Sequence, residues 1–321
     1  MPRPDAATAR PALPAEGERP LPPWPGRTVQ VPGTTPLYVR RAASPGGEPA
    51  VFVHGLGGSA TNWTDLMALL RDRLDGHAPD LPGHGRSAPP ADGSYALDTH
   101  AAAVVAYIRS LGGGPVHLLG NSLGGVVSIR VAAEHPELVR TLTLVSPAVP
   151  QYRLRRTNDP RLALLLLPGM SGLVDRERAK ATARGVAESV LRLCTYDLAV
   201  IHPDRIDEAA AEVRRRRALP WATKSLTGSL RGLVRGYFDP GPRHVWRQLG
   251  TITAPTLVVW GDHDRLVPSA LGPLAVRRLR NGRLLALPDA GHIAQMERPY
   301  VVAEAVRRLL DDAGGSGRVS A

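Results

Sequence analysis

The stretch "LLGNSLGG", residues 118–125, places one serine between glycines directly after an apolar run typical of a buried strand. A serine hydroxyl is a weak nucleophile that must stand clear of its neighbours and within reach of a base. Glycines two residues before and after a serine let a strand and a helix approach closely at a sharp turn, which exposes the hydroxyl. Gly120 and Gly124 stand at these positions, so Ser122 is the candidate nucleophile.

The sequence around this serine alternates between strand-like and helix-like segments. The alternation decides the interpretation, because a chain with 33 glycines can contain Gly-x-Ser-x-Gly by chance. We expect strands at 27–31 and 35–42 and in "PAVFVHG", "HAPD", "PVHLLG" and "TLTLVSP", and helices over 63–74, 96–111 and 122–134. Such alternation predicts an α/β fold, a mostly parallel sheet with helices on both faces.

The alternation stops near Ala148 and resumes near Gly250 with "TLVVWG", a helical stretch, "GRLLALP" and a final helix over 299–310. The sequence between these two residues has helical apolar spacing and is rich in arginine. An all-helical insert in an α/β domain is expected over the carboxyl edge of the sheet, where ligands bind. The sequence therefore predicts an α/β core in two parts, 27–149 and 251–312, with a helical cap inserted at 150–250. A disordered proline-rich extension is expected at 1–26 and a flexible tail at 313–321.

The positive charge of the chain is concentrated in this insert. The formal net charge is +11, and residues 148–250 hold 19 Arg and Lys against 10 Asp and Glu. No stacking aromatics stand between these arginines and no nucleic-acid motif appears, so we expect no nucleic-acid partner. The run Arg214 to Arg217 cannot share one face of a helix and suits a solvated surface. Peripheral contact with an anionic membrane, or an acidic substrate, is the other interpretation of this basic cap.

The cysteine count and the hydropathy of the sequence indicate in which cellular compartment the protein is expected. Cys194 is the single cysteine, which excludes an internal disulfide. The first residues have no apolar segment of the secretory type, and the longest aliphatic run, 162–167, is too short to cross a bilayer. We therefore expect a soluble, cytoplasmic protein.

Four blocks of sequence occur in a familiar order, "HGLGGSATNW", "DLPGHGRS", "GNSLGG" and the pair "GDHDRLVP" and "AGHIAQMERP". On these blocks the chain resembles the α/β-hydrolase fold superfamily over residues 27–310, apart from the cap. The resemblance implies a catalytic triad in the order serine, acid, histidine. His292 is the only histidine after "GDHD", which makes it the base, and the position of the acid ahead of a proline selects Asp264 over Asp262.

The same resemblance implies where negative charge on a reacting carbonyl oxygen would be stabilised. The residue after the nucleophile and the loop after "HG" supply backbone N–H groups, here those of Leu123 and Leu56. The implied function is a serine hydrolase of carboxylic esters with an apolar acyl group, acting through an acyl-enzyme that water releases. It needs no metal and no organic cofactor. The apolar stretch 162–174 suits the wall of an acyl pocket, or the core of the cap itself.

Three other functions are weighed against the ester hydrolase. The elbow "GNS" and the "AQ" after the histidine resemble hydrolases that cleave carbon–carbon bonds of vinylogous diketones, although Ile293 stands where those enzymes usually have tryptophan. Cofactor-free perhydrolases and haloperoxidases typically have methionine where Leu123 stands. A non-catalytic binding protein of this fold is disfavoured by the intact set Ser122, Asp264 and His292.

Overall fold

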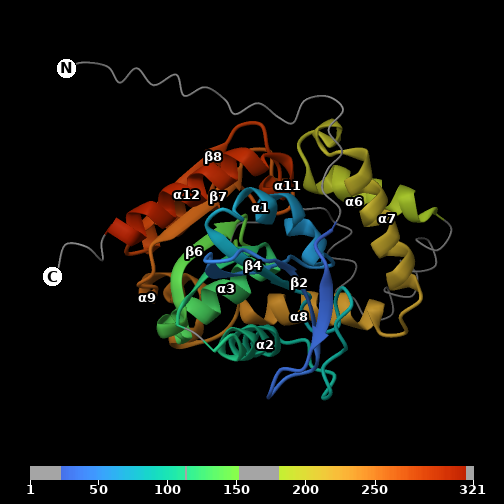
Figure 1. Cartoon of the computed structure of the whole chain (residues 1–321), viewed down its shortest axis with the longest axis horizontal. Coiled ribbons are helices and arrows are strands. Elements are labelled where there is room, and N and C mark those ends of the chain that lie inside the picture. The colour runs from blue at the N-terminus through green and yellow to red at the C-terminus, as the bar shows by residue number, and fades with distance from the viewer. Residues whose placement is uncertain (1–22, 113, 152–180, 316–321) are drawn as a thin grey trace.

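A computed structural model of the protein describes residues 23–112, 114–151 and 181–315. Its described strands form one eight-stranded sheet in the order β1-β2-β4-β3-β5-β6-β7-β8 (Figure 1). Strand β2 is antiparallel to both of its neighbours, and every other pair is parallel. The strands are β1 Gly26–Val29, β2 Leu37–Ala42, β3 Glu48–Val53, β4 Leu74–Pro79, β5 Val116–Asn121, β6 Val139–Val145, β7 Thr256–Gly261 and β8 Gly282–Leu287.

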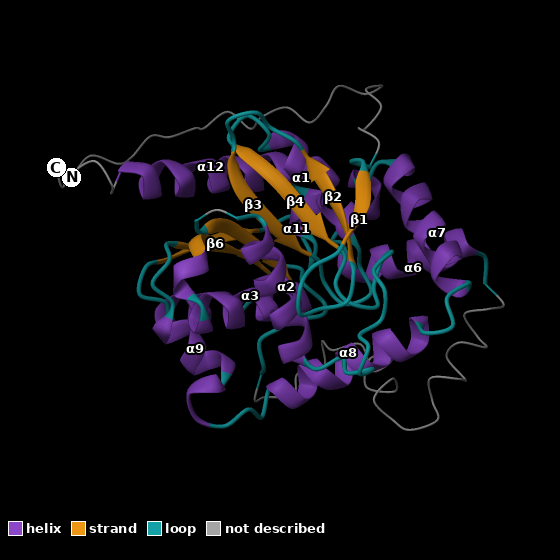
Figure 2. Cartoon of the chain, turned by 60° about the horizontal axis from the view of Figure 1, so that its bottom comes forward, coloured by secondary structure: helices purple, strands orange, loops and turns teal. Residues whose placement is uncertain are grey.

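Helices cover both faces of this sheet (Figure 2), which confirms the expected α/β architecture. One face packs against α2, α3, α9 and α10 and the other against α1 and α12, and each face has its own apolar cluster. All six residues of β5 are buried because both faces of the strand are covered. The described helices are α1 Thr64–Leu69, α2 Leu97–Ser110, α3 Leu123–Glu134, α6 Ala183–Cys194, α7 Pro203–Arg217, α8 Ala222–Gly236, α9 Val245–Thr251, α10 Leu271–Arg278, α11 Ala294–Glu297 and α12 Pro299–Gly315, with short 3-10 turns at Ala60–Trp63, Pro136–Leu138, Leu198–Val200 and Gly241–Arg243.

Two element boundaries differ from the sequence-based expectation. The helix expected over 63–74 ends at Leu69, and Leu74 is the first residue of β4. Apolar residues continue at helical spacing past Leu69 because Leu70, in the turn after α1, and Leu74, in β4, are both buried in the same apolar cluster. Helix α12 continues to Gly315, so residues 313–315 are helical rather than part of a flexible tail.

The start of the described chain is also held in place. The Trp24 indole N–H donates to the carbonyl of Thr64 at 3.0 Å, so the last residues of the expected extension pack on the core. The rest of the expected extension, residues 1–22, and of the expected tail, residues 316–321, lies outside the described residues.

Three of the described helices between β6 and β7 divide into two groups. Helices α6 and α7 pack on each other beyond the edge of the sheet (Figure 1), and α7 is tied to α1 by Arg205, which donates to Asp65 at 2.6 and 3.0 Å. Helix α9 lies within the range expected for the cap but packs on α3 and α10, so we place it with the core.

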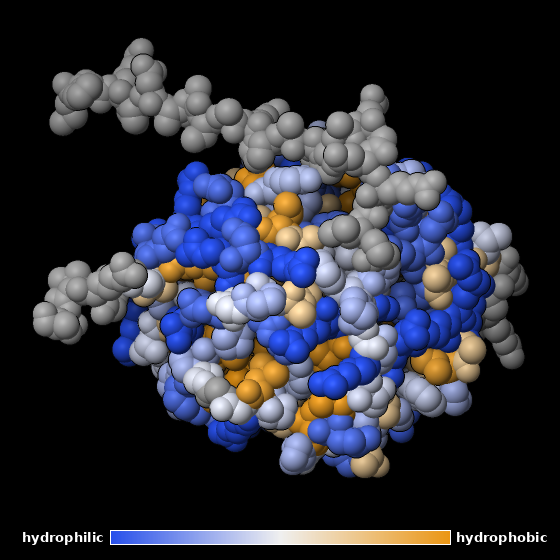
Figure 3. All heavy atoms as spheres, viewed as in Figure 1, coloured by the Kyte–Doolittle hydropathy of each residue, from blue (hydrophilic) through white to orange (hydrophobic). Residues whose placement is uncertain are grey.

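The surface seen in Figure 3 is mostly hydrophilic, with apolar side chains in scattered patches. Scattered apolar side chains are ordinary on a protein surface. Among the helices of the described ranges, none has both the length and the apolar character needed to span a bilayer.

Three buried histidines lie behind the loops that follow β3 and β4. The ring centroids of His54 and His84 are 5.6 Å apart, and those of His84 and His100 are 5.7 Å apart. Burial lowers the pKa of His54 to about 4 and the pKa values of His84 and His100 to about 3. The folded protein therefore keeps these imidazoles neutral at a pH where an unfolded chain would protonate them.

We expect the free energy of unfolding to be highest above pH 6.5 and to fall as the pH drops toward 4. Lowering the pH from 7.5 to 5.5 costs about 1.4 kcal/mol of unfolding free energy for each of the three histidines, because only the unfolded state takes up their protons. Burial raises the pKa of Asp80 to about 6, and this acid offsets part of the loss by binding a proton in the folded state. Urea unfolding at the two pH values should therefore show a net loss of roughly 3 kcal/mol.

A variant pair tests the assignment of this pH dependence. His100→Gln removes one buried titrating ring and should reduce the difference in unfolding free energy between the two pH values by about 1.4 kcal/mol. His135→Gln, at a partly exposed position, should leave the difference unchanged. Equal stability of the unaltered protein at pH 7.5 and 5.5 would contradict the expectation.

Candidate active site

Ser122 occupies a sharp turn between β5 and α3. Its φ of 55° lies in the left-handed region that favours glycine, and its ψ is −117°. Three backbone hydrogen bonds hold it there: its N–H donates to Val145 at 3.1 Å, and its carbonyl accepts from Val126 at 3.2 Å and Ala148 at 3.0 Å. A non-glycine residue held in a costly backbone conformation by its surroundings is typical of functional sites.

The glycines of the elbow are required by close backbone contacts. A Cβ atom on Gly120 would collide with the carbonyl oxygen of Gly124, and a Cβ atom on Gly124 would collide with the carbonyl oxygens of Val53 and His54. Helix α3 therefore starts directly against the end of strand β3. This contact places the turn at Ser122 beside the loop that follows His54.

The expected acid and base are in contact. His292 Nδ1 lies 2.8 Å from Asp264 Oδ2, and the two residues follow neighbouring strands, β7 and β8. The other carboxylate oxygen, Oδ1, accepts the backbone N–H groups of Leu266 and Val267, each at 2.9 Å. Both residues of the pair are buried, whereas Asp262 is exposed. A ring that donates Nδ1–H to a carboxylate keeps its Nε2 lone pair free to accept a proton.

The elbow and the histidine loop are joined through Asn121. Its side-chain Nδ2 donates to the carbonyl of His292 and to that of Val145, both at 3.1 Å. The Ser122 hydroxyl makes no hydrogen bond with any residue in the described ranges. Hydrogen bonds of a catalytic group often tighten only when substrate binds. The contact of Ser122 with His292 is therefore part of the proposal below.

The two expected oxyanion donors come from neighbouring parallel strands. Val53 of β3 is in register with Gly120 of β5, so the loops that follow the two strands emerge side by side. A Cβ atom on Gly55 would lie 3.1 Å from that of Ser122. The backbone N–H groups of Leu56 and Leu123 donate no hydrogen bond within the described part of the chain.

The His54 side chain contacts the loop that follows β3 and the loop that follows β4. Its Nδ1 lies 2.8 Å from the carbonyl oxygen of Gly55, and its Nε2 accepts the N–H of Leu81 at 3.0 Å. Accepting an N–H at Nε2 requires the neutral ring with its proton on Nδ1, in agreement with the lowered pKa of this histidine.

Glu297, which no motif in the sequence singles out, binds the loop that carries His292. It is buried, and its two carboxylate oxygens accept the N–H groups of Gly291 and Tyr196, each at 2.7 Å. The N–H of His292 in turn donates to the carbonyl of Cys194 at 2.7 Å. The histidine loop is thus bonded to the segment that follows α6. A glutamate in "AQMERP", five residues after the histidine, is the only signal in the sequence.

Two arginines of the run at the end of α7 contact the core, whereas the sequence suggested that the whole run is solvated. Arg215 donates to the carbonyl of Gly85, and Arg216 donates to that of Gly57 at 2.7 Å, in the loop that follows His54. Both side chains are half-buried, whereas Arg214 and Arg217 are exposed. Helix α7 therefore contacts two loops of the core. The stretch 162–174, considered for an acyl pocket, lies outside the described residues.

Comparison with known proteins places the chain in a family. The model of the alpha/beta hydrolase fold family matches residues 49–299. The chain is 27% identical over 272 residues to monoacylglycerol lipase abhd6-B of Xenopus laevis, covering 83% of this chain and 76% of the lipase. It is 28% identical over 275 residues to a 2-hydroxy-6-oxononadienedioate/2-hydroxy-6-oxononatrienedioate hydrolase of Cupriavidus pinatubonensis, covering 83% and 86% of the two chains.

Among solved structures, a 2-hydroxy-6-oxo-6-phenylhexa-2,4-dienoate hydrolase from Rhodococcus sp. strain RHA1 superimposes with a TM-score of 0.72 at 20% identity, over 89% of this chain and all of that one. At this identity the likeness concerns the fold. The family match spans the serine elbow, the acid loop and the histidine loop together. The chain belongs to the α/β-hydrolase fold family.

Proposed function

We propose that this protein is a serine hydrolase that cleaves carboxylic esters with an apolar acyl group. The observation that carries the proposal is the 2.8 Å contact between His292 Nδ1 and Asp264 Oδ2, on a loop that Asn121 ties to the Ser122 elbow. Acyl transfer needs a base that a carboxylate orients and a serine hydroxyl that the base can reach, and Ser122 is partly exposed at the turn. The family supports hydrolase chemistry, and the similarity to a monoacylglycerol lipase supports an acyl ester.

The reaction proceeds in two halves. His292 Nε2 takes the proton of Ser122 as Oγ bonds to the ester carbonyl carbon, and the charge on the carbonyl oxygen is stabilised by the N–H groups of Leu56 and Leu123. His292 then gives its proton to the departing alcohol, which leaves an acyl-enzyme. Water loses a proton to His292 and attacks the acyl carbon, so that the carboxylic acid departs and Ser122 recovers its proton. Asp264 keeps the ring in the required tautomer.

A carbon–carbon bond hydrolase is the second candidate. The similarity to the dienedioate hydrolase of Cupriavidus pinatubonensis favours it, and the same serine, histidine and acid would serve. Assaying purified protein with nitrophenyl esters of increasing acyl length and with a dienone acid separates the two. We expect ester cleavage with no dienone cleavage, and the reverse result would exchange the candidates.

Ser122→Ala should abolish both nitrophenyl ester turnover and covalent labelling by a fluorophosphonate. The reason is that the variant lacks the oxygen that bonds to the acyl carbon and to phosphorus. Ser128→Ala, in the same helix region but with its hydroxyl bonded to the carbonyl of Gly124, is the matched control and should retain labelling. Full turnover in the Ser122 variant would exclude the proposed nucleophile.

Asp264→Asn should lower kcat for ester hydrolysis by about 10⁴-fold, because an amide favours the wrong tautomer of His292. Asp262→Asn removes an exposed carboxylate two residues away and should leave kcat within about twofold of the unaltered protein. Steady-state kinetics on the two variants measures the difference. An equal loss in both would show that the acid is assigned to the wrong residue.

A further inference from the structure

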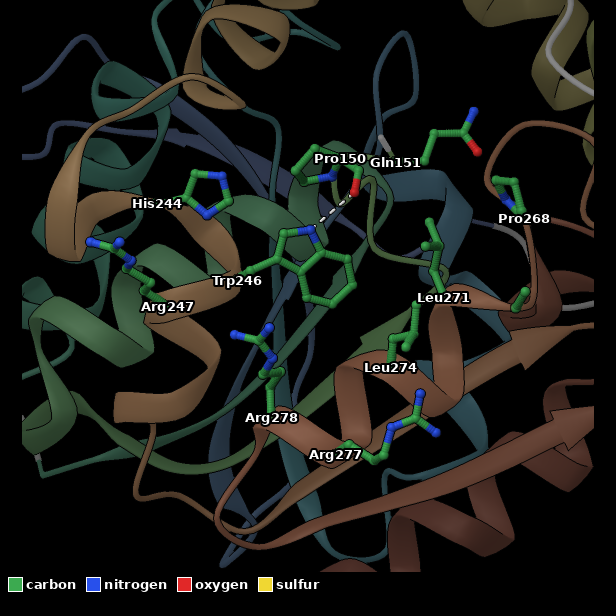
Figure 4. Close-up of a pocket in the computed structure, with 11 residues that line it drawn as sticks. Pro150, Gln151, His244, Trp246, Arg247, Pro268, Leu271, Leu274, Arg277 and Arg278 are labelled. Carbon is green, nitrogen blue, oxygen red and sulfur yellow. Dashed lines mark hydrogen bonds between the residues drawn. The ribbon is translucent and has the colours of Figure 1, made fainter. Parts of the chain in front are cut away.

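A pocket of about 790 Å³ lies between helices α9 and α10 (Figure 4). Its apolar lining includes Trp246 from α9 and Leu271 and Leu274 from α10. The Trp246 indole N–H donates to the carbonyl of Pro150 at 3.0 Å, which fixes the ring within the lining. The volume falls within the range of roughly 300–1,000 Å³ that is usual for small-molecule sites.

Three arginines give this pocket a positive charge. Arg247, Arg277 and Arg278 line it together with the apolar residues, and no acidic residue does so within the described chain. Their guanidinium groups form no ion pair or hydrogen bond with any described residue, although most arginines described elsewhere in the chain have such a partner. Because a guanidinium matches a carboxylate with two parallel N–H bonds, unpartnered arginines beside an apolar wall suit an anionic head on an apolar chain.

Guanidinium groups and apolar side chains both line the pocket (Figure 4). In the view of Figure 4, the Trp246 indole stands between Arg247 on one side and the two leucines of α10 on the other. An occupant with one charged end can therefore contact guanidinium groups and apolar side chains at the same time. A small inorganic anion would contact the exposed guanidinium groups alone, and a neutral chain would contact the apolar side chains alone.

We propose that this pocket binds a single-chain amphiphile that ends in a carboxylate. None of Ser122, Asp264 and His292 lines it, so it is a second site. It adjoins the candidate active site at two points: the N–H of Ala148, two residues before Pro150, donates to Ser122, and Pro268 follows Asp264 in the same loop. The proposal does not depend on ester hydrolysis.

Calorimetric titration of the full chain carrying Ser122→Ala tests the proposal apart from any turnover. The probes are dodecanoate below its micelle-forming concentration, 1-dodecanol as the neutral chain of equal length, and vesicles containing phosphatidylglycerol. We expect dodecanoate to bind and 1-dodecanol to bind at least tenfold more weakly. Because binding is measured without the nucleophile, a failure of the proposed hydrolase would leave this test unaffected.

The double variant Arg277→Gln, Arg278→Gln should weaken dodecanoate binding about tenfold. The double variant Arg140→Gln, Arg308→Gln removes the same charge from exposed surface pairs with Glu48 and Glu304, outside the pocket, and should leave binding unchanged. Leu274→Asp, at an exposed position on the apolar wall, should also weaken it. Absence of dodecanoate binding, equal binding of 1-dodecanol, equal loss in the two double variants, or binding to vesicles alone would each overturn the proposal.

Discussion

Contact between the first turn of α3 and the carbonyl oxygens at the end of β3 is the constraint on which the candidate site depends. Gly124 permits this contact because it has no Cβ atom. The chain must therefore reverse direction within one residue, and Ser122 takes the left-handed conformation at a cost of about 1–3 kcal/mol. Three backbone hydrogen bonds from β6, α3 and the loop after β6 offset that cost. Backbone atoms thus place the turn at Ser122 against the loop that follows His54.

The sheet brings the other loops of the candidate site to its carboxyl edge. Parallel strands β3, β5, β7 and β8 all end at this edge, so the loops that follow them converge. These loops carry Leu56, Ser122, Asp264 and His292. Strand pairing alone aligns them, and no contact between distant side chains is needed. Side chains then refine the geometry. Asn121 joins the elbow to the histidine loop, and Asp264 uses one oxygen for its own turn and the other for His292.

The sequence predicts most of the fold and the contact of Asp264 with His292, because these depend on local periodicity and on short motifs in a fixed order. It does not predict where α1 ends, since Leu70 and Leu74 keep helical spacing while they belong to a turn and to a strand. It also misses Glu297 and Arg216. Their partners, Tyr196 and Gly57, lie about 100 and 160 residues away, and no local pattern marks such pairs. The pairing of Ser122 with His292 stays a prediction.

The hydrogen bonds of Glu297 have a consequence for hybrid enzymes of this family. Tyr196 lies in the insert and Gly291 lies in the core, and one carboxylate binds the N–H groups of both. Exchanging the insert for that of a relative, to change which molecules are accepted, would also exchange the neighbours of His292. A chimera that keeps residues 194–197 from this chain preserves the hydrogen bonds that hold the His292 loop, so the natural junction for such grafting lies between these residues and α7.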